Sequence, residues 1–91
     1  MIAQGAGICA SQRVPRFYFV VHDVAGVAAD DDGAELADFE AACLHATAGA
    51  RSIMSDGVRD GMLDLSGFIE IEDQARVVLV RVSFRDALKI T

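Results

Sequence analysis

Apolar residues recur with two different periods along the chain, and the period shows where strands and a helix are expected. The segment 16–22, RFYFVVH, places Phe17, Phe19 and Val21 on one side of an extended chain, and its aromatic and β-branched residues favour a strand. A short second strand is expected near residues 27–30, after a turn that contains glycine. The two segments are therefore predicted to form a hairpin.

A spacing of three to four residues predicts one amphipathic helix from about Asp38 to Asp60. Asp38 is suited to cap the first turn and Gly61 the last. Gly49 and Gly57 each cost roughly 1 kcal/mol relative to Ala inside a helix. The stripe predicted to face the core comprises Leu36, Phe39, Cys43, Ala46, Ala50, Ile53 and Gly57, widened by Met54 and Val58.

In residues 68–73 and 77–84, apolar residues occupy alternate positions and would face the same side of an extended chain. This pattern predicts a second hairpin. A two-residue turn at 74–75 would place Ile71 opposite Val78, so that the apolar rows of both strands share one face. The inward row of the last strand would then be Val78, Val80, Val82 and Phe84. The expected fold is α+β, a small antiparallel sheet of three to four strands in β-β-α-β-β order with the helix packed on one face.

The length of 91 residues allows one core, which we assign to residues 15–91, with residues 1–14 as a flexible N-terminal tail. The net charge of -6 opposes binding to nucleic acid or to an anionic membrane. Without an apolar run of membrane-spanning length or a signal peptide pattern, the expected location is the cytoplasm. Cys9 and Cys43 are expected to be reduced thiols.

Two metal sites can be considered, and neither pattern is complete. In a calcium loop with Gly33 at the sixth position, Ala28 and Phe39 would occupy ligand positions that require carboxylates. Zinc would need Cys43 and His45 together, but residues two apart on a helix point about 200° away from each other. We expect no metal site and no cofactor.

The sequence contains none of the catalytic motifs that would indicate an enzyme. No Gly-x-Ser-x-Gly motif and no glycine-rich phosphate loop after a strand occurs, and the acidic residues are spread along turns and strand exteriors. We therefore expect no catalytic residue and a protein that is not an enzyme. A minor enzyme or ligand binder using Tyr18 and His22 remains open, and it would need a pocket beside the first strand.

The sheet face opposite the helix, the outer sheet face, is the surface on which we expect function. It mixes aromatic, aliphatic and arginine side chains, a composition typical of interfaces, although exposed apolar residues are also common on ordinary surfaces. Glu70 and Glu72 are expected among them. The candidate interface residues are Arg16, Tyr18, Val20, His22, Phe68, Val77, Leu79 and Arg81.

Two functions follow from this pattern. The first is protein association, most simply a homodimer through the outer sheet face. The alternative is an acidic, antitoxin-like inhibitor that binds a basic partner protein, as favoured by the net charge of -6. We expect no nucleic-acid partner and no membrane in either case.

Five segments, taken in their order and spacing, form a recognisable pattern: PRFYFVVHD (15–23), DDDGAELADFEAA (30–42), ARSIMSDGVRDGMLDLSG (50–67), FIEIED (68–73) and VSFRDAL (82–88). With them the sequence resembles a family of short bacterial proteins that contain a domain of unknown function. The resemblance implies a fold and a bacterial origin, and no catalytic residue. Arg76 stands where the family usually has a turn glycine, which predicts a strained left-handed residue. Val14 stands where the family usually starts, so residues 1–13 are either an artefact upstream of a GTG start codon or a genuine extension.

Overall fold

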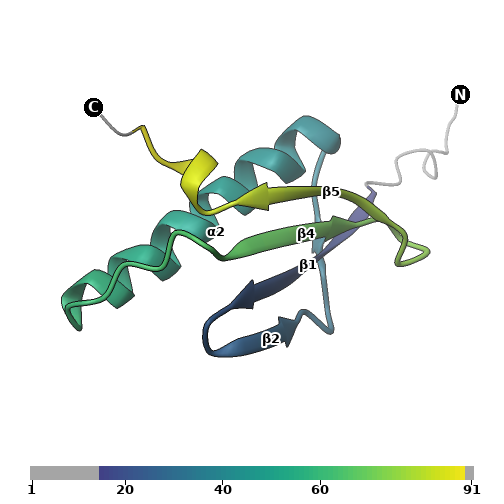
Figure 1. Cartoon of the computed structure of the whole chain (residues 1–91). Coiled ribbons are helices and arrows are strands. Elements are labelled where there is room, and N and C mark those ends of the chain that lie inside the picture. Colours follow the sequence, from purple (N-terminus) through teal and green to yellow (C-terminus); the bar gives the residue numbers. More distant parts are fainter. Residues whose placement is uncertain (1–14, 90–91) are drawn as a thin grey trace, which may run out of the picture.

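The computed structural model describes residues 15–89, which form an antiparallel sheet with one α-helix on one face (Figure 1). The α+β class is confirmed. Within this range the sheet has five strands, slightly more than the three to four predicted, and the predicted tail lies outside the described residues. The elements in chain order are β1 (Arg16–Asp23), β2 (Gly26–Ala29), β3 (Ala34–Glu35), α2 (Phe39–Arg59), β4 (Phe68–Glu72), β5 (Val78–Ser83) and the 3-10 helix η1 (Arg85–Ala87).

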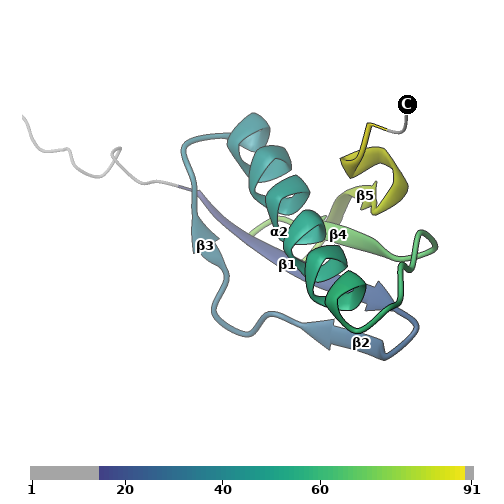
Figure 2. The same ribbon diagram turned by 90° about the vertical axis from the view of Figure 1, so that its left-hand side faces the viewer.

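The strand order is β2-β1-β4-β5, with the short β3 pairing with the beginning of β1. Every pair is antiparallel, and β1 and β4 register Phe19 with Ile71 and Val21 with Ile69. Figure 2 shows α2 lying across one face of this sheet. The aromatic and aliphatic rows of the two central strands therefore lie beneath the helix.

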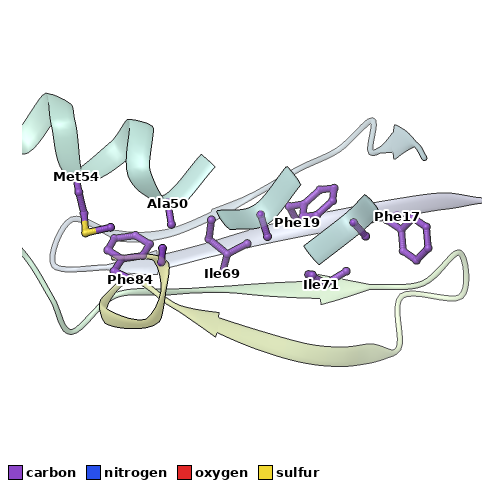
Figure 3. Close-up of a cluster of buried hydrophobic side chains, with 10 residues drawn as sticks. Phe17, Phe19, Ala50, Met54, Ile69, Ile71 and Phe84 are labelled. Carbon is purple, nitrogen blue, oxygen red and sulfur yellow. The ribbon is translucent and has the colours of Figure 1, made fainter. Parts of the chain in front are cut away.

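The core lies between α2 and the central strands, and it is closed at one end by the residues that follow β5. Small side chains on the helix let it approach the sheet closely, whereas the large ones come from the strands (Figure 3). The buried side chains of this cluster are Phe17, Phe19, Ile69 and Ile71 from the sheet, Ala42, Ala46, Ala50 and Met54 from the helix, and Phe84 and Ala87.

The buried face of α2 is turned relative to the predicted stripe. Its centre is a row of residues four apart, 42, 46, 50 and 54, whereas Cys43 and Ile53 are only partly buried beside it. Phe39 is 45% exposed and Val58 is 55% exposed, so their placement in the core was wrong. Alanines on several sides of the helix made the stripe ambiguous, and contact with the sheet selects the row of small residues.

Both helix ends have the predicted caps. At the N-terminus, Asp38 accepts a hydrogen bond from the Ala41 N–H at 2.8 Å. At the C-terminus, Gly61 has φ +86° and donates to the carbonyl of Val58, while Met62 donates to the carbonyl of Gly57. These two bonds form a Schellman motif, and the positive φ explains why glycine stands at position 61.

The register of the second hairpin differs from the prediction by two residues. Ile71 pairs with Val80 rather than Val78, and a bulge places Val78 across from Glu72. The cause is a longer turn, in which a carboxylate oxygen of Asp73 accepts the N–H groups of Ala75 and Val77. A shift of two residues preserves which side each residue faces, so Val80 and Val82 still pack against the core. The placement of Val78 in the same inward row was wrong, because it lies at the bulge and is 45% exposed.

No helix within residues 15–89 combines the length and the apolar character that crossing a membrane requires.

Candidate interaction surface

The strand register brings most of the candidate interface residues together on three neighbouring strands. Tyr18 pairs with Glu72, Val20 with Glu70, and His22 with Phe68, so these side chains share the outer sheet face. Arg81 and Ser83 extend the same rows onto β5, opposite Glu70 and Phe68. The outer sheet face is thus assembled much as the alternation of residues predicts.

Glu70 is the centre of one cluster on this surface. One carboxylate oxygen lies 2.9 Å from Nε2 of His22, and the other accepts a hydrogen bond from Nε of Arg81, also at 2.9 Å. The imidazole of His22 stacks on the ring of Phe68 with centroids 4.5 Å apart, and the Arg81 guanidinium lies 4.9 Å from the centroid of the same ring. We name these four residues the His22 cluster.

The hydrogen bond with His22 is the main cause that lowers the pKa of Glu70 below its ordinary value of 4.5, and Arg81 lowers it further. Partial burial acts in the opposite direction without overcoming these contacts. Glu70 is therefore ionised near neutral pH and holds His22 and Arg81 in fixed positions. The His22 cluster is a polar patch in which Glu70 bonds His22 and Arg81 beside the Phe68 ring.

Arg76 organises a second cluster with Tyr18 and Glu72. Its guanidinium lies 4.0 Å from the centroid of the Tyr18 ring, and its Nε is 2.9 Å from Oε1 of Glu72. That oxygen is buried, and its partner is the Arg76 guanidinium. The contact between Arg76 and Glu72 is therefore a partly buried ion pair. Sequence reasoning did not place Arg76 on this surface, since its position depends on the turn after β4.

Apolar side chains gather beside these clusters on the β5 side. Val77, Val78 and Leu79 are 56%, 45% and 43% exposed, and β5 forms one edge of the sheet. Val20, in contrast, is buried and is not available to a partner. Arg16 lies at the other margin, where it pairs with Glu35 and donates to the carbonyl of Asp32. The accessible apolar part of the surface is therefore formed by residues 77–79.

A shallow hollow of about 180 Å³ lies beside the end of β1. Its lining includes His22, Phe68 and Ser66, whereas Tyr18 lies further along the strand and does not contribute. The Nε2 atom of His22 is occupied by Glu70. A ligand site that uses both Tyr18 and His22 is therefore not formed by this hollow.

The other residues considered as metal ligands do not form a common site in the described part of the chain. His45 packs its ring against Phe19, with centroids 4.7 Å apart, and Cys43 is a half-buried free thiol. The carboxylate of Asp30 accepts backbone N–H groups from Asp32 and Gly33, as in a turn. Within residues 15–89, no three His, Cys, Asp or Glu side chains are grouped so that they could hold a metal ion.

The fold and this surface define a small α+β domain with a helix on one side of its sheet and a polar and aromatic face on the other. A family model for a domain of unknown function, DUF6894, matches residues 16–85, and the chain belongs to that family. The family resemblance seen in the sequence is thereby confirmed. No curated protein and no solved structure matches the chain.

Proposed function

We propose that this domain is a cytoplasmic bacterial protein that is not an enzyme and acts by protein association, most simply as a homodimer through the outer sheet face. The observation that carries the proposal is the position of Val77, Val78 and Leu79. They are exposed at an open sheet edge, where Val78 pairs with Glu72 of the cluster that Arg76 forms with Tyr18. An apolar centre with a polar, arginine-bearing rim is typical of protein interfaces.

The charged residues of this surface also favour an interface over a bare surface. Glu70 and Glu72 already have cationic partners in the chain, so covering them would leave no isolated carboxylate. The rings of Tyr18 and Phe68 are held by Arg76 and by His22, respectively. Preordered side chains lose little conformational entropy on binding.

The experiment is a mass measurement in solution by size exclusion with light scattering. We expect the unchanged protein to be a dimer, with about twice the chain mass of 9.7 kDa. The double variant Val77→Lys with Leu79→Lys should be a folded monomer, because both side chains are exposed. Tyr18→Asp with Phe68→Asp should also be monomeric, with its fold checked by circular dichroism.

Leu44→Lys is the matched control, since Leu44 is 67% exposed on α2 and lies outside the outer sheet face. It should leave the dimer unchanged. An unchanged protein that is monomeric at all concentrations and has no partner would exclude the proposal.

The second candidate is an acidic inhibitor of a basic partner protein. It is supported by the net charge of -6 and by the exposed carboxylates of Asp31, Asp32, Asp38 and Glu40 before and at the start of α2. A small basic reading frame next to the gene, whose product forms a complex with this protein, would favour it over self-association.

A further inference from the structure

A second surface lies on the helix side of the sheet, at the end where α2 stops. A cavity of about 110 Å³ opens between the last turns of α2, the end of β1 and the loop that leads to β4. Its wall includes Ile53, Met54, Met62 and Phe84, and two carboxylate residues, Asp23 and Asp64, belong to its lining. Figure 3 shows Met54 next to Phe84 at this end of the core.

The size of the cavity fits one aliphatic side chain. A dry cavity of about 150 Å³ lined by aliphatic and aromatic residues holds a benzene molecule, so a smaller one accommodates a group the size of a Leu or Ile side chain. The wall is formed by two methionines, an isoleucine and a phenylalanine, and methionine adapts its shape to different apolar groups. The cavity therefore selects for an apolar anchor.

Two negative charges at the cavity have no cationic partner within residues 15–89. Asp64 accepts the N–H groups of Ser66 and Val24, and Asp23 accepts the N–H group of Ala25. The bonds to Ser66 are the main cause that lowers the pKa of Asp64, so this carboxylate is charged near neutral pH. A cation next to the apolar anchor would therefore be attracted.

Exposed apolar side chains around the cavity indicate that the occupant is larger than one side chain. Val24 and Met62 belong to the lining and are more than half exposed. Val58 and Leu63, which follow the lining residues Gly57 and Met62 in the chain, are also more than half exposed. A free small amine would fill the cavity without covering these residues. A polypeptide would bury them while one of its side chains enters the cavity, as anchor residues do at interfaces.

We propose that this cavity binds a segment of a partner protein in which an aliphatic residue such as Leu is flanked by Lys or Arg. The aliphatic side chain enters the cavity and packs against Met54, Met62 and Phe84. The flanking cations face Asp23 and Asp64. Asp23 and Val24 also line the hollow beside His22, so the cavity adjoins the outer sheet face. Its apolar wall of Met54, Met62 and Phe84 contains none of the residues proposed for the dimer interface.

The experiment is an NMR titration with four probes: acetylated and amidated Gly-Lys-Leu-Lys-Gly, the same peptide with Ser in place of Leu, the same peptide with Glu in place of both Lys, and isopentylamine. We expect the first peptide to bind at least about tenfold more tightly than the other three probes. The largest changes in amide chemical shift should occur at Val24, Gly57, Met62 and Asp64.

Three variants test whether binding occurs at this cavity. Met62→Lys should weaken binding of the first peptide by about tenfold, because it removes an apolar wall and adds a like charge. Asp23→Asn, which keeps the acceptor for Ala25, should weaken it less. The matched control Leu44→Lys should leave the affinity unchanged, since Leu44 is similarly exposed on α2 and does not line the cavity.

Three results would overturn the proposal: no binding of the first peptide, equal binding of the acidic peptide, or equal binding of isopentylamine. The last result would identify a site for small amines. If the protein is monomeric and still binds the basic peptide, the dimer proposal is wrong and the peptide site is supported.

Discussion

Arg76 shows how one residue can be both strained and useful. Its φ of 67° lies in the left-handed region, as the missing turn glycine predicts, and this conformation costs a non-glycine residue about 1 to 2 kcal/mol. The same residue contacts the ring of Tyr18 and pairs with Glu72. These contacts with Tyr18 and Glu72 offset part of the strain.

Replacing Arg76 by Gly and by Ala separates the strain from the contacts. Both variants lose the contacts with Tyr18 and Glu72, but only Gly relieves the left-handed strain. Arg76→Ala should therefore be less stable than Arg76→Gly, by about 1 kcal/mol in the free energy of unfolding by urea. Equal stabilities would show that position 76 is not strained.

Glu70 gives the surface a defined pH dependence. Because its pKa is lowered in the folded state, the stability it contributes is fully present above the ordinary value of about 4.5 and is lost as the pH falls through the lowered value. The free energy of unfolding of the unchanged protein should fall more steeply below about pH 4.5 than that of Glu70→Gln. Parallel curves in acid denaturation would contradict this.

The pKa of Glu70 itself can be followed by carboxyl NMR. His22→Leu removes the main hydrogen bond and should raise the pKa of Glu70 towards 4.5. His22→Gln, which keeps a donor, should raise it less. No change in either variant would mean that His22 does not hold the carboxylate.

Two glycines beside secondary-structure elements differ in the space that a side chain would find: Gly49 inside α2 and Gly67 before β4. A Cβ at Gly49, inside α2, would meet only the end of the Ile69 side chain at 3.7 Å, which is ordinary contact. A Cβ at Gly67, before β4, would lie 2.5 Å from the Phe84 ring and 2.9 Å from the carbonyl oxygen of His22. Gly67 is therefore needed for the close approach of Phe84 to the sheet.

The paired substitutions should change stability in opposite directions. Gly49→Ala should raise the free energy of unfolding by about 0.5 to 1 kcal/mol through helix propensity. Gly67→Ala should lower it by about 1 to 3 kcal/mol, because a buried ring must move. Thermal unfolding of the two variants beside the unchanged protein measures both, and a loss of stability at position 49 would show that the helix packs differently there.

The elements that could be predicted are those fixed by local chemistry. Residues close together in the chain determine which side chains of β1 and β4 face the core, and they determine both helix caps. The second hairpin could not be placed in register, because parity alone does not distinguish shifts of two residues and the side chain of Asp73 lengthens the turn. The rotation of α2 depends on its contact with the sheet, which no local pattern contains.

At the scale of the whole molecule, the sequence identified the outer sheet face but not its arrangement. The alternation of residues places Tyr18, His22, Phe68 and Arg81 on it, whereas the role of Arg76 depends on the longer turn. The cavity at the end of α2 was not foreseen, since its lining comes from separate segments of the chain and no local spacing connects them.

We propose that copies of this chain associate through the outer sheet face. The most direct measurement is isotope-filtered NMR on an equal mixture of labelled and unlabelled protein, which detects only contacts between two chains. We expect contacts between chains from Phe68, Val77 and Leu79 and none from Leu44, which lies on α2. Contacts between chains from α2 alone, or none at any concentration, would contradict the account.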